Sequence, residues 1–105
     1  LGRRVAVVVA GTAATHGSDH SGAPGDAGAQ TTYVLDKIAA AIVALGGSVE
    51  DVVRTRIFVR DVADVEAVSI AHGRMFGDVR PANTLVAASD LVGDYAVEIE
   101  AEAVV

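Results

Sequence analysis

The sequence contains no cysteine and no tryptophan, and aromatic residues make up only 4% of its 105 positions. The lack of cysteine excludes disulfide bonds and thiolate metal sites. With so few aromatic side chains, the core must be built from Val, Ala, Ile and Leu, each of which buries little area. We therefore expect association with other copies of the chain to contribute to stability.

Long apolar runs and an excess of positive charge are also absent. The strongest early apolar run, residues 5–10, is far shorter than the roughly 20 residues of a membrane-spanning helix. No secretory signal pattern is present. The formal net charge of −6 disfavours a general attraction to nucleic-acid phosphates. We expect a cytoplasmic protein that binds neither membranes nor nucleic acid.

The stretch 53–60, VRTRIFVR, alternates with the period of a β-strand. One of its faces suits a cover of helices, and the other is rich in arginine. The last strand candidate, residues 95–104, carries glutamates on one face, so we predict a ladder of ion pairs between the two strands. The arginines are Arg54, Arg56 and Arg60, the glutamates are Glu98, Glu100 and Glu102, and the helix-side residues of the first stretch are Val53, Thr55, Ile57 and Val59.

Three further strands are predicted, two near the start of the chain and one before the last strand. The apolar run in residues 3–10 is typical of a strand buried on both faces. Residues 12–15 favour a short second strand, and residues 17–28 favour an exposed Gly-rich loop. A strand over 81–88 follows Pro81, since proline disfavours helix in the residue before it.

Two amphipathic helices are predicted, each with a start and a stop signal. The first spans residues 26–45, with Asp26 as its N-cap and the glycines at 46–47 as its end. The second spans about 62–76. Because both helices are amphipathic, we predict an α+β fold in which they pack on one face of a mixed β-sheet. The apolar stripe of the first helix is Val34, Leu35, Ile38, Ala41, Ile42 and Leu45, and the N-cap candidates of the second are Asp61 and Asp64.

Residues 46–61 (GGSVEDVVRTRIFVRD) and 97–104 (VEIEAEAV) resemble the signature segments of the Rid (YjgF) family, and residues 80–82 (RPA) are similar to its approach to the following strand. The resemblance runs from Leu1 to Val105, with a shorter loop before Arg80. It implies one Rid-like domain over residues 1–105 with a chorismate-mutase-like fold, whose first family strand is missing upstream of Leu1. It also implies a homotrimer with small-molecule clefts at its subunit interfaces, and no cofactor.

The archetype of the family is a deaminase that hydrolyses reactive 2-imino acids to keto acids and ammonia. The resemblance places the position of its carboxylate-binding arginine at Asn83, a neutral residue that cannot form the charged fork. It places the water-positioning glutamate at Glu98, a strand serine at Ala10 and a helix asparagine at Ser69. Arg80 is a candidate to restore the lost charge, but a shift of three residues along a strand changes its face.

Three functions remain open from these residues. The first is an enzyme that acts on a small imine, enamine or related carbonyl compound, with Glu98 assisting water. The second is a metabolite-binding or regulatory trimer without catalysis, and the third is a scaffold. Glu98 is either a site residue or a rung of the ion-pair ladder, whereas Glu100 and Glu102 are predicted to belong to the ladder. Because Asn83 is uncharged, we expect weak or no hydrolysis of 2-imino acids.

The sequence contains three histidines, His16, His20 and His72. His16 and His20 flank Asp19 in the Gly-rich loop, and imidazole and carboxylate are ligands of zinc. The loop offers no fourth ligand, so we predict no metal site there. His72 lies on the apolar stripe of the second helix and is predicted to be a packed or interface residue.

Overall fold

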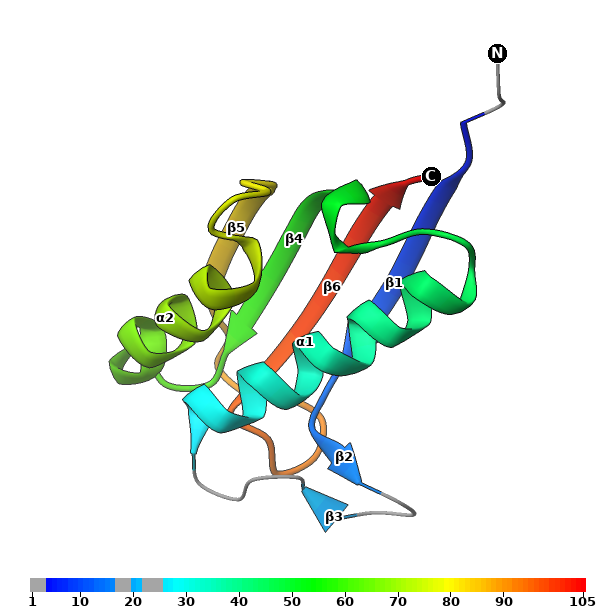
Figure 1. The fold of residues 1–105 in the computed structure, drawn as a ribbon. Helices are drawn as coiled ribbons and strands as arrows, with labels where there is room; N and C mark the ends of the chain where they lie inside the picture. The colour runs from blue at the N-terminus through cyan, green and yellow to red at the C-terminus, as the bar shows by residue number, and fades with distance from the viewer. Residues whose placement is uncertain (1–3, 17–19, 22–25) are drawn as a thin grey trace.

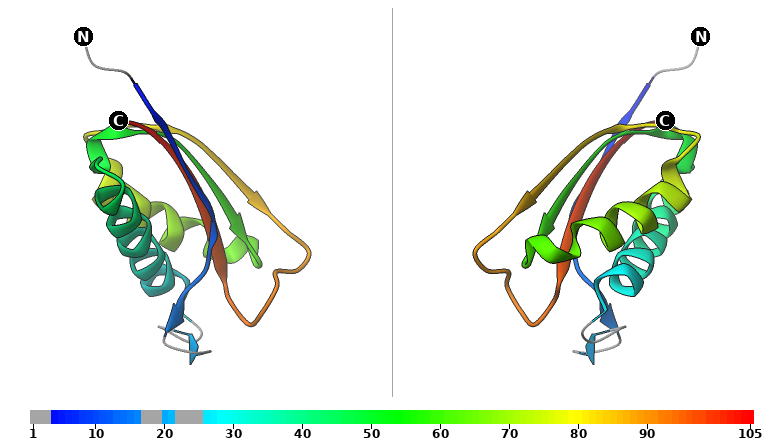
Figure 2. Two further views of the ribbon diagram at one scale, coloured as in Figure 1. Left: turned by 90° about the vertical axis from the view of Figure 1, so that its right-hand side faces the viewer. Right: turned by 90° about the vertical axis from the view of Figure 1, so that its left-hand side faces the viewer.

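The computed structural model describes residues 4–16, 20–21 and 26–105. Its four-stranded sheet has the order β1-β6-β4-β5, and both helices cover the same face of it (Figures 1 and 2). β4 is parallel to β5, and the other pairs are antiparallel, so the predicted α+β fold with a mixed sheet is confirmed. The elements are β1 (Ala6–Thr12), α1 (Ala27–Ala44), β4 (Val52–Val59), α2 (Val65–Phe76), β5 (Ala82–Ala87) and β6 (Val97–Val104).

The helices begin and end near the signals in the sequence. The Asp26 carboxylate accepts a hydrogen bond from the backbone three residues on, at 2.9 Å, and caps α1. Gly46 follows the end of α1 with φ +92, a conformation that favours glycine. Before α2 the chain forms a 3-10 turn, Val62–Asp64. Asp61 caps this turn, and Asp64 makes no capping hydrogen bond because α2 continues directly from the turn.

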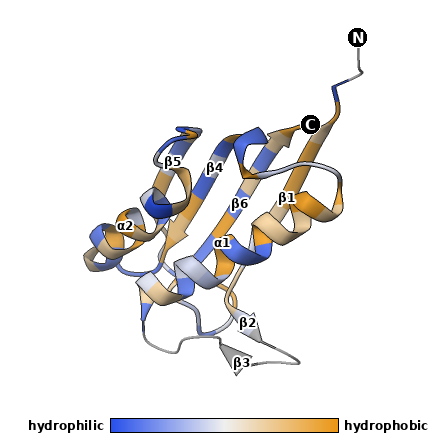
Figure 3. Ribbon diagram, in the orientation of Figure 1, coloured by the Kyte–Doolittle hydropathy of each residue, from blue (hydrophilic) through white to orange (hydrophobic). Residues whose placement is uncertain are grey.

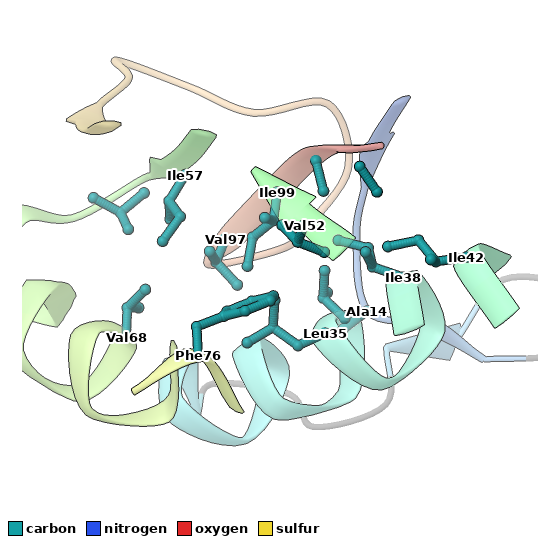
Figure 4. Close-up of a cluster of buried hydrophobic side chains, with 14 of the residues drawn as sticks. Ala14, Leu35, Ile38, Ile42, Val52, Ile57, Val68, Phe76, Val97 and Ile99 are labelled. Atoms are coloured by element: carbon teal, nitrogen blue, oxygen red, sulfur yellow. The ribbon is translucent and has the colours of Figure 1, made fainter. Parts of the chain in front are cut away.

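The core lies between the sheet and the two helices, as the close-up in Figure 4 shows. Ile57 of β4 and Ile99 of β6 are paired neighbours, and both are almost completely buried. The helices close over them with aliphatic side chains and Phe76. The labelled core residues are Ala14, Leu35, Ile38, Ile42, Val52, Ile57, Val68, Phe76, Val97 and Ile99.

A bulge at the start of β4 changes one predicted position. The register between β4 and β6 shifts between Val52 and Arg54. The extra residue places Val52 in the core and leaves Val53 47% exposed, so the predicted helix-side position of Val53 is wrong. From Thr55 onward the predicted alternation is confirmed, because Thr55, Ile57 and Val59 are all buried.

The predicted burial of residues 3–10 on both faces is wrong for a single chain. Val7 is 6% exposed, but Val8 is 71% exposed, since the helices cover one face of the sheet and leave the other open. β1 is nevertheless hydrophobic along most of its length (Figure 3). Leu45, predicted in the α1 stripe, is 62% exposed because it is the C-cap beyond the last turn. Arg3 lies outside the described residues.

The predicted Gly-rich loop is described in part. A second sheet pairs β2 (Thr15–His16) with β3 (His20–Ser21), and α1 begins early enough that Gly28 belongs to the helix. Asp19 and the other residues of 17–19 and 22–25 lie outside the described residues, and with them one member of the ligand set His16, Asp19 and His20. Within the described ranges, no helix has the length and apolar character needed to cross a membrane.

Candidate functional site

The open face of the sheet, which the helices leave uncovered, carries an ion-pair ladder with two rungs. Arg56 Nη1 lies 2.6 Å from Glu100 Oε1, and Arg54 pairs with Glu102 one step along the strands. The hydrogen bond from Arg54 lowers the pKa of Glu102. Both pairs are partly exposed, so their main effects are to fix the register and to neutralise the arginines. The ladder is confirmed for Glu100 and Glu102.

The third possible rung, between Arg60 and Glu98, does not form. Arg60 lies just beyond the end of β4, and its guanidinium turns toward the loop before β6. There it pairs with Asp90 and donates to backbone carbonyls in residues 91–95. Glu98 instead stands opposite Phe58 in the β4–β6 register. Among the described residues Glu98 has no ion pair, so its carboxylate remains available to a ligand.

The Glu98 side chain lies over a bulge in β1. The register of β1 against β6 shifts between Val9 and Thr12, which brings Gly11 beneath the carboxyl group. A Cβ atom at Gly11 would stand 3.0 Å from the carboxyl carbon of Glu98, which is tighter than ordinary contact. Glycine therefore leaves room for this carboxylate. A partly buried carboxylate without a cation beside it can accept a hydrogen bond from water and orient it.

Asn83 lies on the opposite side of the sheet from Glu98. In the parallel β4–β5 register it stands beside Thr55, whose side chain is fully buried beneath the helices. Asn83 Nδ2 donates a hydrogen bond to Thr55 Oγ1 at 2.9 Å. Because β5 is an edge strand, Asn83 itself remains exposed.

His72 of α2 extends this pair to a chain of three polar side chains. Its Nε2 atom lies 2.9 Å from Thr55 Oγ1, and its ring centroid lies 4.7 Å from that of Phe76. Burial lowers the pKa of His72, so the ring is neutral at pH 7 and can accept a hydrogen bond. His72 is therefore packed, as predicted. Its contact with Thr55 was missed from the sequence, although a threonine at a buried strand position already signals a polar partner.

Two of the remaining predicted site residues lie one on each side of the sheet, the open face that carries Glu98 and the helix side that carries Asn83. Ala10 is exposed beside Gly11 and, by strand alternation, belongs to the open face with Glu98. Ser69 is exposed one turn before His72 on α2 and so lies on the helix side, with Asn83. Arg80 lies in the turn before β5 with φ +55, and its Nε is 3.5 Å from the Gly77 carbonyl oxygen. Arg80 therefore lies in a turn and not on a strand face. One chain therefore keeps Ala10 and Glu98 apart from Asn83 and Ser69.

Comparison with known proteins agrees with this arrangement of elements. The family model described as Endoribonuclease L-PSP matches residues 2–105. The structure of Rv2704 from Mycobacterium tuberculosis, a YjgF/YER057c/UK114 family member, is similar with a TM-score of 0.82 and 39% identity, covering 95% of this chain and 79% of that one. The chain belongs to the Rid (YjgF) family. Its predicted fold and family are confirmed.

Several relatives of this Rid-family chain are named as deaminases. The 3-aminoacrylate deaminase RutC of Acinetobacter baylyi is 39% identical over 75 residues, which is 71% of this chain and 60% of the relative. The 2-iminobutanoate/2-iminopropanoate deaminase of Escherichia coli is 36% identical over 84 residues, 77% of this chain and 66% of the relative. The chain thus spans about three fifths of the length of RutC.

The open face of this Rid-family chain has a shallow hollow over the ion-pair ladder. Its volume is about 50 Å³, and it is lined by side chains of β1, β4 and β6, among them Val8, Arg56 and Glu100. Ligand pockets usually enclose about 300 Å³ or more. This hollow is therefore too small to enclose a metabolite in one chain.

Proposed function

We propose that this protein binds small molecules in clefts formed between three copies of the chain, and that it acts there on imines, enamines or related carbonyl compounds. The observation that supports this proposal is the separation of Glu98 and Asn83 onto opposite faces of one sheet. A cleft that holds both groups must join the open face of one copy to the β5 edge of another. The deaminase names of two relatives support the reaction class.

The proposed reaction is hydrolysis of a carbon–nitrogen double bond. Glu98 accepts a hydrogen bond from a water molecule and directs its oxygen at the imine carbon. Addition of water gives a carbinolamine, whose carbon–nitrogen bond then breaks to release ammonia and the carbonyl product. Gly11 keeps the Glu98 carboxylate in its place over the β1 bulge. No metal or cofactor enters this scheme.

The second candidate function is a metabolite-binding or regulatory trimer without turnover. It is favoured by Asn83, since this position carries no cation to hold the carboxylate of a 2-imino acid. A screen of imines and enamines separates the two functions. In an enzyme, Glu98→Gln abolishes turnover, whereas in a binding protein Glu98→Gln leaves ligand affinity largely unchanged.

The charges of this chain disfavour the RNA binding that an endoribonuclease, the activity named by the matching family model, would need. RNA binding requires free cations that track the phosphate backbone. The net charge is −6, and the open-face arginines Arg54 and Arg56 are already neutralised by glutamates. Arg60 is likewise held by Asp90. These charges favour a small-molecule ligand over nucleic acid.

The proposed trimer rests on apolar side chains among the ion pairs of the open face. Val8 is 71% exposed beside Glu102, and Val86 is 43% exposed beside Phe58. A monomer leaves these side chains in water, and contact between open faces removes them from it. We therefore propose that the open faces of three copies turn toward a shared axis.

Light scattering at micromolar concentration tests this assembly. We expect a homotrimer for the wild type and a monomer for Val8→Glu, because a carboxylate in an apolar contact is costly to desolvate. Val43→Glu is the matched control, since Val43 is 61% exposed on α1, and we expect it to remain trimeric. A monomeric wild type, or equal dissociation of both variants, would argue against open-face contact.

A further inference from the structure

The amide of Asn83 has one favoured orientation. Its Nδ2 atom lies 2.9 Å from Thr55 Oγ1 and 3.5 Å from the Thr55 backbone carbonyl oxygen. Exchanging Nδ2 and Oδ1 would place two acceptors, the amide oxygen and the carbonyl oxygen, against each other. Nδ2 therefore points inward, and Oδ1 points away from Thr55. Among the described residues, Oδ1 of Asn83 has no hydrogen-bond partner.

The orientation of the Asn83 amide determines the direction of the hydrogen bond between Thr55 and His72. Thr55 is fully buried, so its hydroxyl proton needs an acceptor, and an unpaired buried donor is costly. With Asn83 donating to Thr55 Oγ1, the acceptor within reach is the Nε2 atom of neutral His72 at 2.9 Å. His72 then carries its own proton on Nδ1. The hydrogen bonds run in one direction, from Asn83 through Thr55 to His72.

We infer that Asn83 selects a ligand group that donates a hydrogen bond, such as a primary amide or a hydroxyl. A carboxylate is disfavoured at the same place. The Oδ1 atom of Asn83 is an acceptor, and a ligand carboxylate at neutral pH offers acceptors alone. Thr55 and His72 act as positioning residues, since they hold the amide without touching the ligand. The inference rests on the proposed cleft and names the class of ligand that fits it.

A matched pair of probes tests the inference without relying on turnover. 2-Oxobutanamide and 2-oxobutanoate differ at the group that would meet Asn83, an amide in one and a carboxylate in the other. Titration of each into wild-type trimer, followed by the NMR signals of the Asn83 side-chain amide, gives two affinities. We expect the amide to bind roughly tenfold or more tightly. Equal binding, tighter binding of the carboxylate, or binding of neither overturns the inference.

Substitution of Thr55 tests the role of the hydrogen-bond chain. We expect Thr55→Val to weaken or remove the preference for the amide, because Asn83 Nδ2 then loses its 2.9 Å acceptor and keeps only the 3.5 Å contact with the backbone carbonyl. Thr55→Ser keeps the hydroxyl and is expected to retain the preference. If Thr55→Val fails to fold, His72→Phe removes the acceptor while keeping a ring beside Phe76, and the same loss is expected. A preference that survives loss of the hydroxyl or the acceptor would overturn the positioning role.

The outcomes of these titrations also distinguish failure of this inference from failure of the proposed function. A trimer that binds the carboxylate more tightly than the amide retains the interface cleft but refutes the assignment of Asn83. A chain that is monomeric and binds neither probe refutes both.

Discussion

The Asn83→Arg variant is expected to hydrolyse 2-iminobutyrate faster than the wild type by roughly one to two powers of ten. A guanidinium can hold the substrate carboxylate with two charge-assisted hydrogen bonds, and such bonds contribute about 1.5–3 kcal/mol. The wild-type amide offers no charge and presents its oxygen outward. Better placement of the imine carbon beside the attacking water would add to the gain.

The assay generates 2-iminobutyrate in situ and follows keto acid release. Asn83→Gln is the matched control, because it lengthens the side chain without adding charge, and no gain is expected from it. Adding Glu98→Gln to Asn83→Arg is expected to remove the gained activity. Wild-type activity already as high as that of Asn83→Arg would contradict the role given to position 83 and would point to Arg80 as the cation that holds the substrate.

The Ile57→Ala variant is expected to lose roughly 2–5 kcal/mol of unfolding free energy, since it leaves a cavity in the centre of the core. Ile57 is 1% exposed and lies against Ile99 beneath the helices (Figure 4). Val59→Ala is expected to cost less, because fewer atoms are removed. Urea denaturation at one fixed protein concentration measures the unfolding free energy of the wild type and of each variant. Val43→Ala, at an exposed position on α1, is expected to be near neutral.

A neutral Ile57→Ala would contradict the division of β4 into a helix side and an open side. In that case Phe58, which lies on the open face, would have to supply the core contact instead. The decisive comparison is between the unfolding free energies lost by Ile57→Ala and by Val59→Ala, because both positions belong to the same buried face of the strand.

The elements and most of the core could be predicted because they depend on local patterns. Alternation along β4 and β6 places Ile57 and Ile99 in the core, and Asp26 and Gly46 delimit α1 through their own backbone chemistry. The wrong predictions concern residues whose position depends on a partner far away in sequence. Val53 is displaced by a bulge that exists only in the pairing of β4 with β6.

The candidate site was harder to predict than the fold for the same reason. Family resemblance indicated Asn83 and Glu98 but gave no face of the sheet for either. Their separation follows from the register of two strand pairs, which brings Asn83 beside Thr55 and Glu98 beside Phe58. The contact of His72 with Thr55 additionally depends on how α2 packs across the sheet, which neither segment specifies alone.

The proposed meeting of Asn83 and Glu98 between copies can be tested directly, because the chain contains no cysteine. Chains with Asn83→Cys and chains with Glu98→Cys are unfolded and refolded together, then treated with a short bis-maleimide. In the control mixture, Asp36→Cys on α1 replaces Asn83→Cys. We expect covalent dimers that contain one chain of each kind, and none in the control. Absence of such dimers from a folded Asn83→Cys and Glu98→Cys mixture, or a cross-link that forms only within a chain carrying both cysteines, would contradict a site shared between subunits.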